Sequence, residues 1–170
     1  MKEKDRMLFM KYALPCAGTL VKRRSITQEK WDELIAIVKN GDRIPEGSEK
    51  IFKVAFAACS LIALDKNKDI DEEVIRQYYL FEHDKMIDKR YGEMGDFDPD
   101  QCRIRAGVVK SSREGFAVVE NSTGTRRYRT DYCTVAKGDL VTTHWNFIVE
   151  KIDSATADKT KRQKIEMKVV

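Results

Sequence analysis

The sequence of 170 residues predicts an α+β fold, with an N-terminal helical bundle followed by a small five-stranded, OB-like β-barrel and a C-terminal helix. Apolar residues recur at helical spacing over the first 90 or so residues, and from Cys102 onward their period becomes two. Between these halves, residues 91–101 combine two glycines, one proline and four acidic residues, which is typical of a boundary. We therefore expect a helical domain over residues 1–92 and a barrel domain over residues 102–170.

Three helices are well marked in the first half. The first lies within residues 25–41, where Ser25 or Thr27 can cap its start and Gly41 lies just past its end. Its apolar stripe consists of Trp31, Leu34, Ile35 and Val38. Residues 48–64 are apolar around so much of the helix that we expect this helix at the centre of the bundle.

Two further segments complete the predicted bundle. Residues 71–89 begin with acidic side chains and end with basic ones, which favours a helix with that direction. A shorter segment from Met7 to Val21, interrupted at Pro15, predicts one or two more helices.

The second half contains five short strand patterns, in residues 103–111, 115–121, 126–132, 139–145 and 146–152. Five strands in so short a stretch favour a partly closed barrel, because a flat sheet would leave edges exposed. The sequence His144-Trp145-Asn146 falls at a hairpin corner between the last two strands, and residues 153–168 predict a polar helix.

The composition predicts a cytoplasmic protein without a membrane partner. Apolar residues make up 42% of the chain and charged residues 35%, with a net charge of +4 and both signs interspersed. No apolar run approaches the roughly 20 residues that span a bilayer, and the first residues lack the long apolar core of a signal peptide. The four cysteines stand singly, which excludes a zinc knuckle or a thioredoxin-type motif, and Cys59 is expected to be a small core residue.

The barrel half carries two signatures. Cys102 and Gly107 have the spacing C-x4-G. The stretch from residue 137 to residue 153 has the order Gly-Asp, two apolar positions, a histidine and then Phe-Ile-Val-Glu-Lys-Ile-Asp; its signature positions are Gly138, Asp139, His144, Phe147, Lys151 and Asp153. With the arginine-rich strand before them, these residues resemble the HypC/HupF-type hydrogenase-maturation chaperones over about residues 102–166, whereas the helical half has no such resemblance.

The resemblance implies a function for two of these residues. In that family the leading cysteine and this histidine hold a low-spin iron with cyanide and carbonyl ligands while a larger scaffold protein assembles it. By resemblance, Cys102 and His144 are expected to lie together, partly accessible, at one end of the barrel and to bind iron, and the protein is expected to be a non-enzymatic, chaperone-like accessory of a larger maturation or scaffold partner. A thiolate is a soft donor and an imidazole a borderline one, and both suit iron.

The chain has only one further histidine, His83, whose helix face is partly apolar. As an isolated residue it is typical of a packed histidine. If the two domains fold onto each other, His83 is expected to approach Cys102 and to join it and His144 as a third metal ligand. Cys16 and Cys133 are further candidates, but their spacing gives no reason to include either.

Two other functions stay open. The sequence lacks the common hydrolase, nucleotide-binding and metalloprotease motifs, so we predict no enzyme, although Cys102 with a histidine is also the pair that a thiol nucleophile needs. Small barrels commonly bind single-stranded nucleic acid, with Phe116 and Tyr128 available for stacking. The basic residues that favour this alternative are Arg103, Arg105, Lys110, Arg113, Arg126, Arg127 and Arg129.

Overall fold

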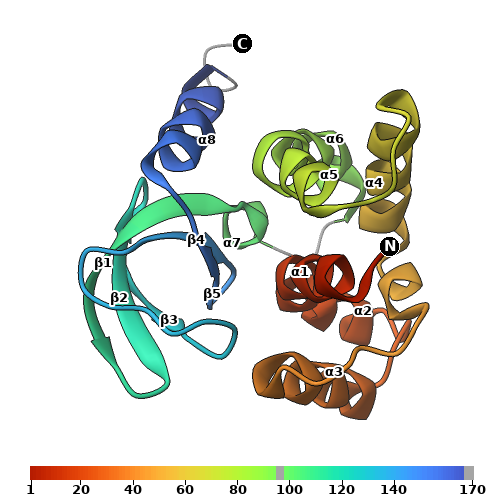
Figure 1. Ribbon diagram of the computed structural model, residues 1–170, viewed down its shortest axis with the longest axis horizontal. Helices are drawn as coiled ribbons and strands as arrows, with labels where there is room; N and C mark the ends of the chain where they lie inside the picture. The colour runs from red at the N-terminus through yellow and green to blue at the C-terminus, as the bar shows by residue number, and fades with distance from the viewer. Residues whose placement is uncertain (95–97, 167–170) are drawn as a thin grey trace. The chain divides into compact units, whose positions relative to one another are not determined.

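The computed structural model describes residues 1–94 and 98–166, and it divides into two compact units, Met1–Phe97 and Asp98–Val170 (Figure 1). The first unit is helical, and the second contains a five-stranded barrel followed by a helix, so the predicted α+β fold is confirmed. Within the described ranges, no helix is both long enough and apolar enough to cross a membrane.

The helical unit begins with two helices joined by a 3-10 turn. The elements are α1 (Glu3–Ala13), the turn η1 (Leu14–Cys16), α2 (Ala17–Lys22), α3 (Gln28–Asn40), the turn η2 (Ser48–Ile51), α4 (Lys53–Asp65), α5 (Glu72–Arg76), the π-helix η3 (Gln77–Glu82) and α6 (His83–Met94). The predicted caps of α3 are confirmed: the Thr27 side chain accepts from the backbone N–H of Lys30, and Gly41 ends the helix with a φ of 73°.

An aromatic cluster forms the core of the helical unit. Phe9 lies edge-on to Phe52, Phe56 and Tyr79, and Tyr12 stacks on Tyr79 with ring centroids 4.9 Å apart. These aromatic residues come largely from α1 and η3, which therefore occupy the centre of the unit.

The prediction that residues 48–64 form the central helix is wrong. The segment is split into η2 and α4, and α4 leaves Leu61 and Leu64 about 68% and 77% exposed, respectively. Only Cys59 and Ala63 of α4 are buried, whereas every aromatic side chain of α1 and η3 is buried. Cys59 is fully buried, as expected, and this burial raises the pKa of its thiol to about 12.

The barrel unit contains the helix α7 (Pro99–Cys102), five strands and the helix α8 (Ser154–Glu166). The strands are β1 (Arg105–Arg113), β2 (Phe116–Asn121), β3 (Gly124–Arg129), β4 (Leu140–His144) and β5 (Phe147–Lys151). They close in the order β1-β2-β3-β5-β4 (Figure 1), with β1 pairing antiparallel to both β2 and β4. The predicted five-stranded barrel is confirmed, and its order matches an OB-like barrel.

Apolar side chains pack together in the interior of the barrel. The core residues are Val109, Ala117, Val119, Tyr128, Val135, Val141 and Ile148, with Cys133 packed against them. Gly107 marks the closest approach of two strands: a Cβ at this position would lie 2.6 Å from Val119 Cγ1 and 2.7 Å from the carbonyl oxygen of Glu120. The glycine of the C-x4-G pattern is therefore required by strand packing.

The stretch predicted as a boundary, residues 91–101, is partly helical. Helix α6 continues to Met94, residues 95–97 lie outside the described ranges, and α7 occupies Pro99–Cys102. Cys102 therefore ends a short helix instead of leading the first strand, because Asp98 and Pro99 supply a cap and a first-turn proline that favour a helix there.

Candidate metal centre

Cys102 and His144 lie next to each other in the barrel unit. The Sγ atom of Cys102 is 3.8 Å from Nε2 of His144. Two donors of one tetrahedral ion lie roughly 3 to 4 Å apart, since metal–ligand bonds measure about 2.0 to 2.3 Å. The predicted proximity of the two residues is confirmed.

The predicted partial accessibility of the pair is wrong. His144 is fully buried and Cys102 is 7% exposed. Strand β4 is buried along both faces from Val141 to His144, so its last side chain does not reach solvent.

A tight hairpin places His144. Strand β4 ends at His144 and β5 begins at Phe147, the two residues pair across the turn, and the predicted corner is confirmed. Trp145, the first turn residue, has a φ of 54°, in the left-handed region that non-glycine residues rarely adopt. This costly conformation turns the chain within two residues.

The same turn holds the segment that carries Cys102. The backbone N–H of Trp145 donates to the carbonyl oxygen of Gln101 over 2.9 Å, so the turn after His144 is fastened to the residue before Cys102. Next to this contact, β1 and β4 pair with Arg105 opposite Thr143. These backbone contacts of the hairpin therefore fix the distance between the Cys102 thiol and the His144 imidazole.

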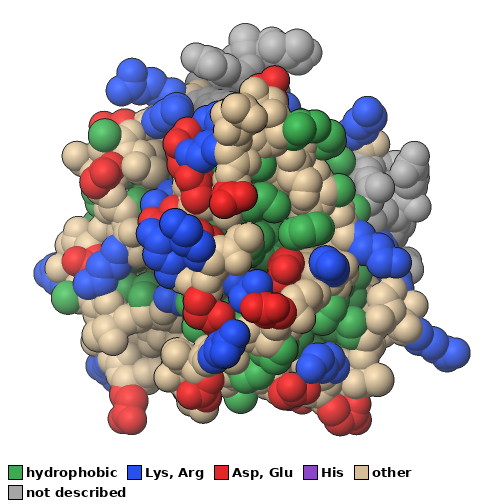
Figure 2. Space-filling view, turned by 45° about the vertical axis from the view of Figure 1, so that its right-hand side comes forward, with side chains coloured by type: hydrophobic (Ala, Val, Ile, Leu, Met, Phe, Trp, Pro, Cys, Tyr) green, Lys and Arg blue, Asp and Glu red, His purple; other side chains and the backbone are tan. Residues whose placement is uncertain are grey.

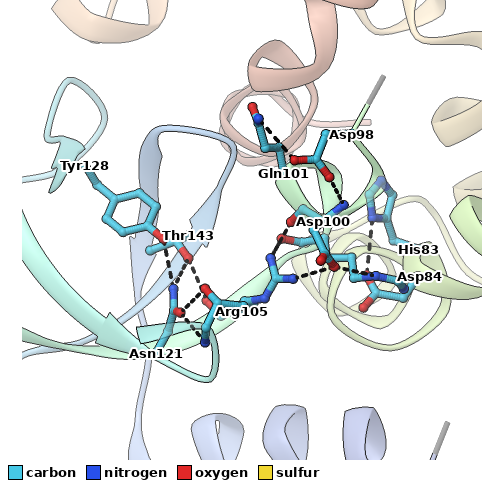
Figure 3. Close-up of polar contacts among 11 residues, drawn as sticks. His83, Asp84, Asp98, Asp100, Gln101, Arg105, Asn121, Tyr128 and Thr143 are labelled. Carbon is cyan, nitrogen blue, oxygen red and sulfur yellow. Dashed lines mark hydrogen bonds and ion pairs between the residues drawn. The ribbon is translucent and has the colours of Figure 1, made fainter. Parts of the chain in front are cut away.

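Hydrogen bonds of polar side chains within and next to α7 stabilise this helix (Figure 3). The Asp98 carboxylate accepts from the backbone N–H of Asp100 over 2.9 Å and from the Gln101 side chain over 3.3 Å. The Arg105 guanidinium donates to the Asp100 carboxylate over 3.1 Å. Arg105, one of the basic residues that favour the nucleic-acid alternative, thus ties the Cys102 helix to β1.

A second polar network lies within the barrel (Figure 3). The Asn121 side-chain amide donates to the Tyr128 hydroxyl over 2.9 Å and to the Thr143 hydroxyl over 3.4 Å. The Thr143 hydroxyl in turn donates to the carbonyl oxygen of Arg105 over 3.2 Å. This network links β2, β3 and β4 to the first residue of β1, and it positions the residue that precedes His144.

The remaining signature residues have structural roles. The Asp139 carboxylate accepts from the backbone N–H of Ala136 and from Lys151, each over 2.8 Å, which closes the loop into β4. Lys151, with the Ala136 N–H, lowers the pKa of Asp139. Asp153 accepts from the backbone N–H of Thr156 at the start of α8, and Phe147 stacks on Tyr132. The chemistry of the signatures is therefore confined to Cys102 and His144.

His83 lies in the helical unit, where it begins α6 and is buried. Its predicted approach to Cys102 stays a prediction. Within its own unit, a ring nitrogen of His83 lies within 4.8 Å of the Cys16 sulfur. The two residues are 67 positions apart in the sequence, so their spacing gives no reason to pair them. Cys133, the other candidate, packs against the barrel core.

The described residues therefore include Cys/His groups that can hold a metal ion. A thiolate and an imidazole together suit zinc, iron and copper and disfavour the hard ions magnesium and calcium. Two protein donors leave part of the coordination sphere to other ligands, which fits an ion that is exchanged or that carries ligands of its own.

No protein-family model matches the chain, and no curated protein is significantly similar to it.

Proposed function

We propose that this protein is a cytoplasmic, non-enzymatic accessory protein that carries an iron complex on Cys102 and His144 and docks on a larger scaffold protein during hydrogenase maturation. One observation carries the proposal, the 3.8 Å separation of Cys102 Sγ and His144 Nε2. The resemblance of residues 102–166 to the maturation chaperones supplies the nature of the cargo.

The donor set fits such a cargo. A thiolate is a soft ligand that suits low-spin iron, and an imidazole is a borderline ligand that tolerates exchange. The cyanide and carbonyl ligands of the cargo occupy other coordination positions, so the protein needs to supply only a small number of donors.

The burial of the pair has a consequence for transfer. Because His144 is fully buried and Cys102 nearly so, loading and release require a movement that opens the site. The short helix α7 is the element suited to this movement, since it holds Cys102 through a few polar contacts while His144 lies in the barrel wall. A scaffold protein that displaces α7 would gain access to the thiolate.

Anaerobic purification from the native source tests the proposal. The wild-type protein is isolated with its bound partners and compared with Cys102→Ala and with the matched control Cys133→Ala. We expect iron by elemental analysis, together with infrared bands of cyanide and carbonyl, in the wild type and in Cys133→Ala. Their absence from wild-type protein isolated with its partner would contradict the proposal.

A second candidate function, binding of single-stranded nucleic acid, is favoured by one surface feature. Phe116 is 37% exposed, and the Arg127 guanidinium lies 3.8 Å from its ring centroid. An aromatic ring with a cation above it is a platform on which bases stack.

Other features weigh against this second candidate. Tyr128 is buried in the barrel core and is not available for stacking. Lys110 and Arg129 are paired with Glu120 and Asp131, which neutralise part of the positive charge of the strands. Figure 2 shows basic and acidic side chains intermixed on the one face that it presents. If a pull-down with this protein captures only RNA, and the affinity for that RNA falls steeply as the salt concentration rises, the second function is the correct one.

A further inference from the structure

The helical unit contains a Cys/His pair of its own. Cys16 ends the turn η1 and is half-buried, and His83 begins α6 and is buried. Their donor atoms lie within 4.8 Å of each other. Two borderline-to-soft donors from distant parts of the chain are thus brought within reach of one ion.

The segment that carries Cys16 is held in place by hydrogen bonds. Pro15 opens the 3-10 turn, and the indole N–H of Trp31 donates to the carbonyl oxygen of Leu14 over 3.1 Å. The Thr19 hydroxyl donates to the carbonyl oxygen of Cys16 over 2.8 Å. The Cys16 backbone is therefore fixed from both sides, which favours a defined position for its thiol.

An unusual helix precedes His83. Residues Gln77–Glu82 form a π-helix between α5 and α6. A π-helical turn is wider than an α-helical turn and is found frequently at functional sites. Because it shifts the angular position of every following residue, it sets the direction in which His83 leaves the helix.

The surroundings of His83 fit a ligand histidine. Its Nδ1 lies 3.8 Å from the carboxylate oxygen of Asp84. This distance is too long for a hydrogen bond, so the carboxylate acts on the ring through its negative charge, which favours a cation bound at the imidazole. The rings of Tyr78 and Tyr79 lie 5.7 and 5.6 Å from the His83 ring and restrict its rotation.

We propose that Cys16 and His83 are metal ligands in the helical unit and that they bind a borderline divalent ion such as Zn²⁺. A thiolate and an imidazole are the protein donors that zinc prefers. The inference does not depend on the iron-carrier function, because every residue that supports it belongs to the helical unit.

Cobalt titration of the full chain tests the proposal. Co²⁺ substitutes for Zn²⁺, and each bound thiolate adds a sulfur-to-cobalt charge-transfer band in the near ultraviolet. The variants are Cys16→Ser, His83→Gln and Cys102→Ser, with Cys133→Ser as the matched control, and far-ultraviolet circular dichroism verifies that each is folded. Equilibrium dialysis counts the ions bound per chain.

We expect Cys16→Ser to lose part of the charge-transfer band, and His83→Gln to weaken Co²⁺ binding by at least about tenfold. Cys133→Ser should match the wild type. If the folded Cys16→Ser and His83→Gln proteins keep the wild-type band and affinity, the proposal is overturned. A loss confined to Cys102→Ser would support the barrel pair alone, and a loss confined to the Cys16 and His83 variants would support the helical pair alone.

Discussion

The backbone N–H of Trp145 donates a hydrogen bond of 2.9 Å to the carbonyl oxygen of Gln101, and this contact joins the turn after His144 to the residue before Cys102. The backbone just before Cys102 is thus bonded to the backbone just after His144, and this contact holds the thiol and the imidazole together. Their 3.8 Å separation is a consequence of barrel closure.

The left-handed conformation of Trp145 should cost stability. Trp145→Gly and Trp145→Ala both remove the indole ring, so the difference between them isolates the backbone. With a φ of 54° at this position, we expect the glycine variant to be more stable than the alanine variant by about 1 kcal/mol. Urea denaturation measures the difference, and an alanine variant as stable as the glycine variant would contradict this account of the turn.

The packing of Gly107 should make it sensitive to a single methyl group. Gly107→Ala brings a Cβ within 2.7 Å of a backbone oxygen, which only a shift of strands can relieve. We expect a loss of about 1 to 3 kcal/mol in the free energy of unfolding. Ser112→Ala, at an exposed position of the same strand, is the control and should change it by less than about 0.5 kcal/mol.

Arg105 should protect the thiol of Cys102 by holding α7 in place. Arg105→Ala removes the contact with Asp100, so the Cys102 helix opens more often. We expect Cys102 to be alkylated faster in this variant, as measured by mass spectrometry of the Cys102 peptide. Cys59 is the internal control, because it is fully buried elsewhere and should react no faster. An unchanged Cys102 rate would show that Arg105 has no positioning role.

The free energy of unfolding should decrease at acidic pH, because protonation of Asp139 removes a stabilising contribution. Its pKa is lowered in the folded protein, first by Lys151 and then by the Ala136 N–H. A carboxylate with a lowered folded pKa stabilises the protein above its ordinary pKa of about 3.9, and this contribution is lost as the pH falls through the folded value.

Asp139→Asn should therefore be less stable than the wild type near pH 7, with the difference shrinking below about pH 4. Lys151→Met should reduce this pH dependence without abolishing it, because the backbone donor remains. Denaturation midpoints of the three proteins between pH 3 and pH 7 measure the effect. A difference that is the same at both ends of the range would rule out the carboxylate as its source.

Much of the barrel could be predicted from the sequence. The period of two marks strands, and the hairpin corner at residues 144–146 follows from two such patterns that meet. The position of Cys102 was harder, because Pro99 and the Asp98 cap create one helical turn too short to give a periodic signal. The burial of His144 could not be predicted either, because a polar residue at a hairpin corner is normally exposed.

The helical unit was predicted less well for a physical reason. The overall apolarity of residues 48–64 suggests a central helix, yet α4 buries only Cys59 and Ala63, and the aromatic contacts of the core come largely from α1 and η3. The π-helix before His83 gives no periodic signal of its own, and the Cys16–His83 proximity depends on tertiary packing. Neither could be inferred from spacing.

X-ray absorption at the metal edge tests the central claim most directly. The protein is purified anaerobically, and the ligand shells around the bound metal are compared in the wild type, Cys102→Ala and His144→Ala. We predict a sulfur shell at about 2.3 Å that diminishes in Cys102→Ala, and a nitrogen shell at about 2.0 to 2.1 Å that diminishes in His144→Ala. If the sulfur shell is unchanged in Cys102→Ala and the nitrogen shell is unchanged in His144→Ala, the claim that Cys102 and His144 bind the metal is contradicted.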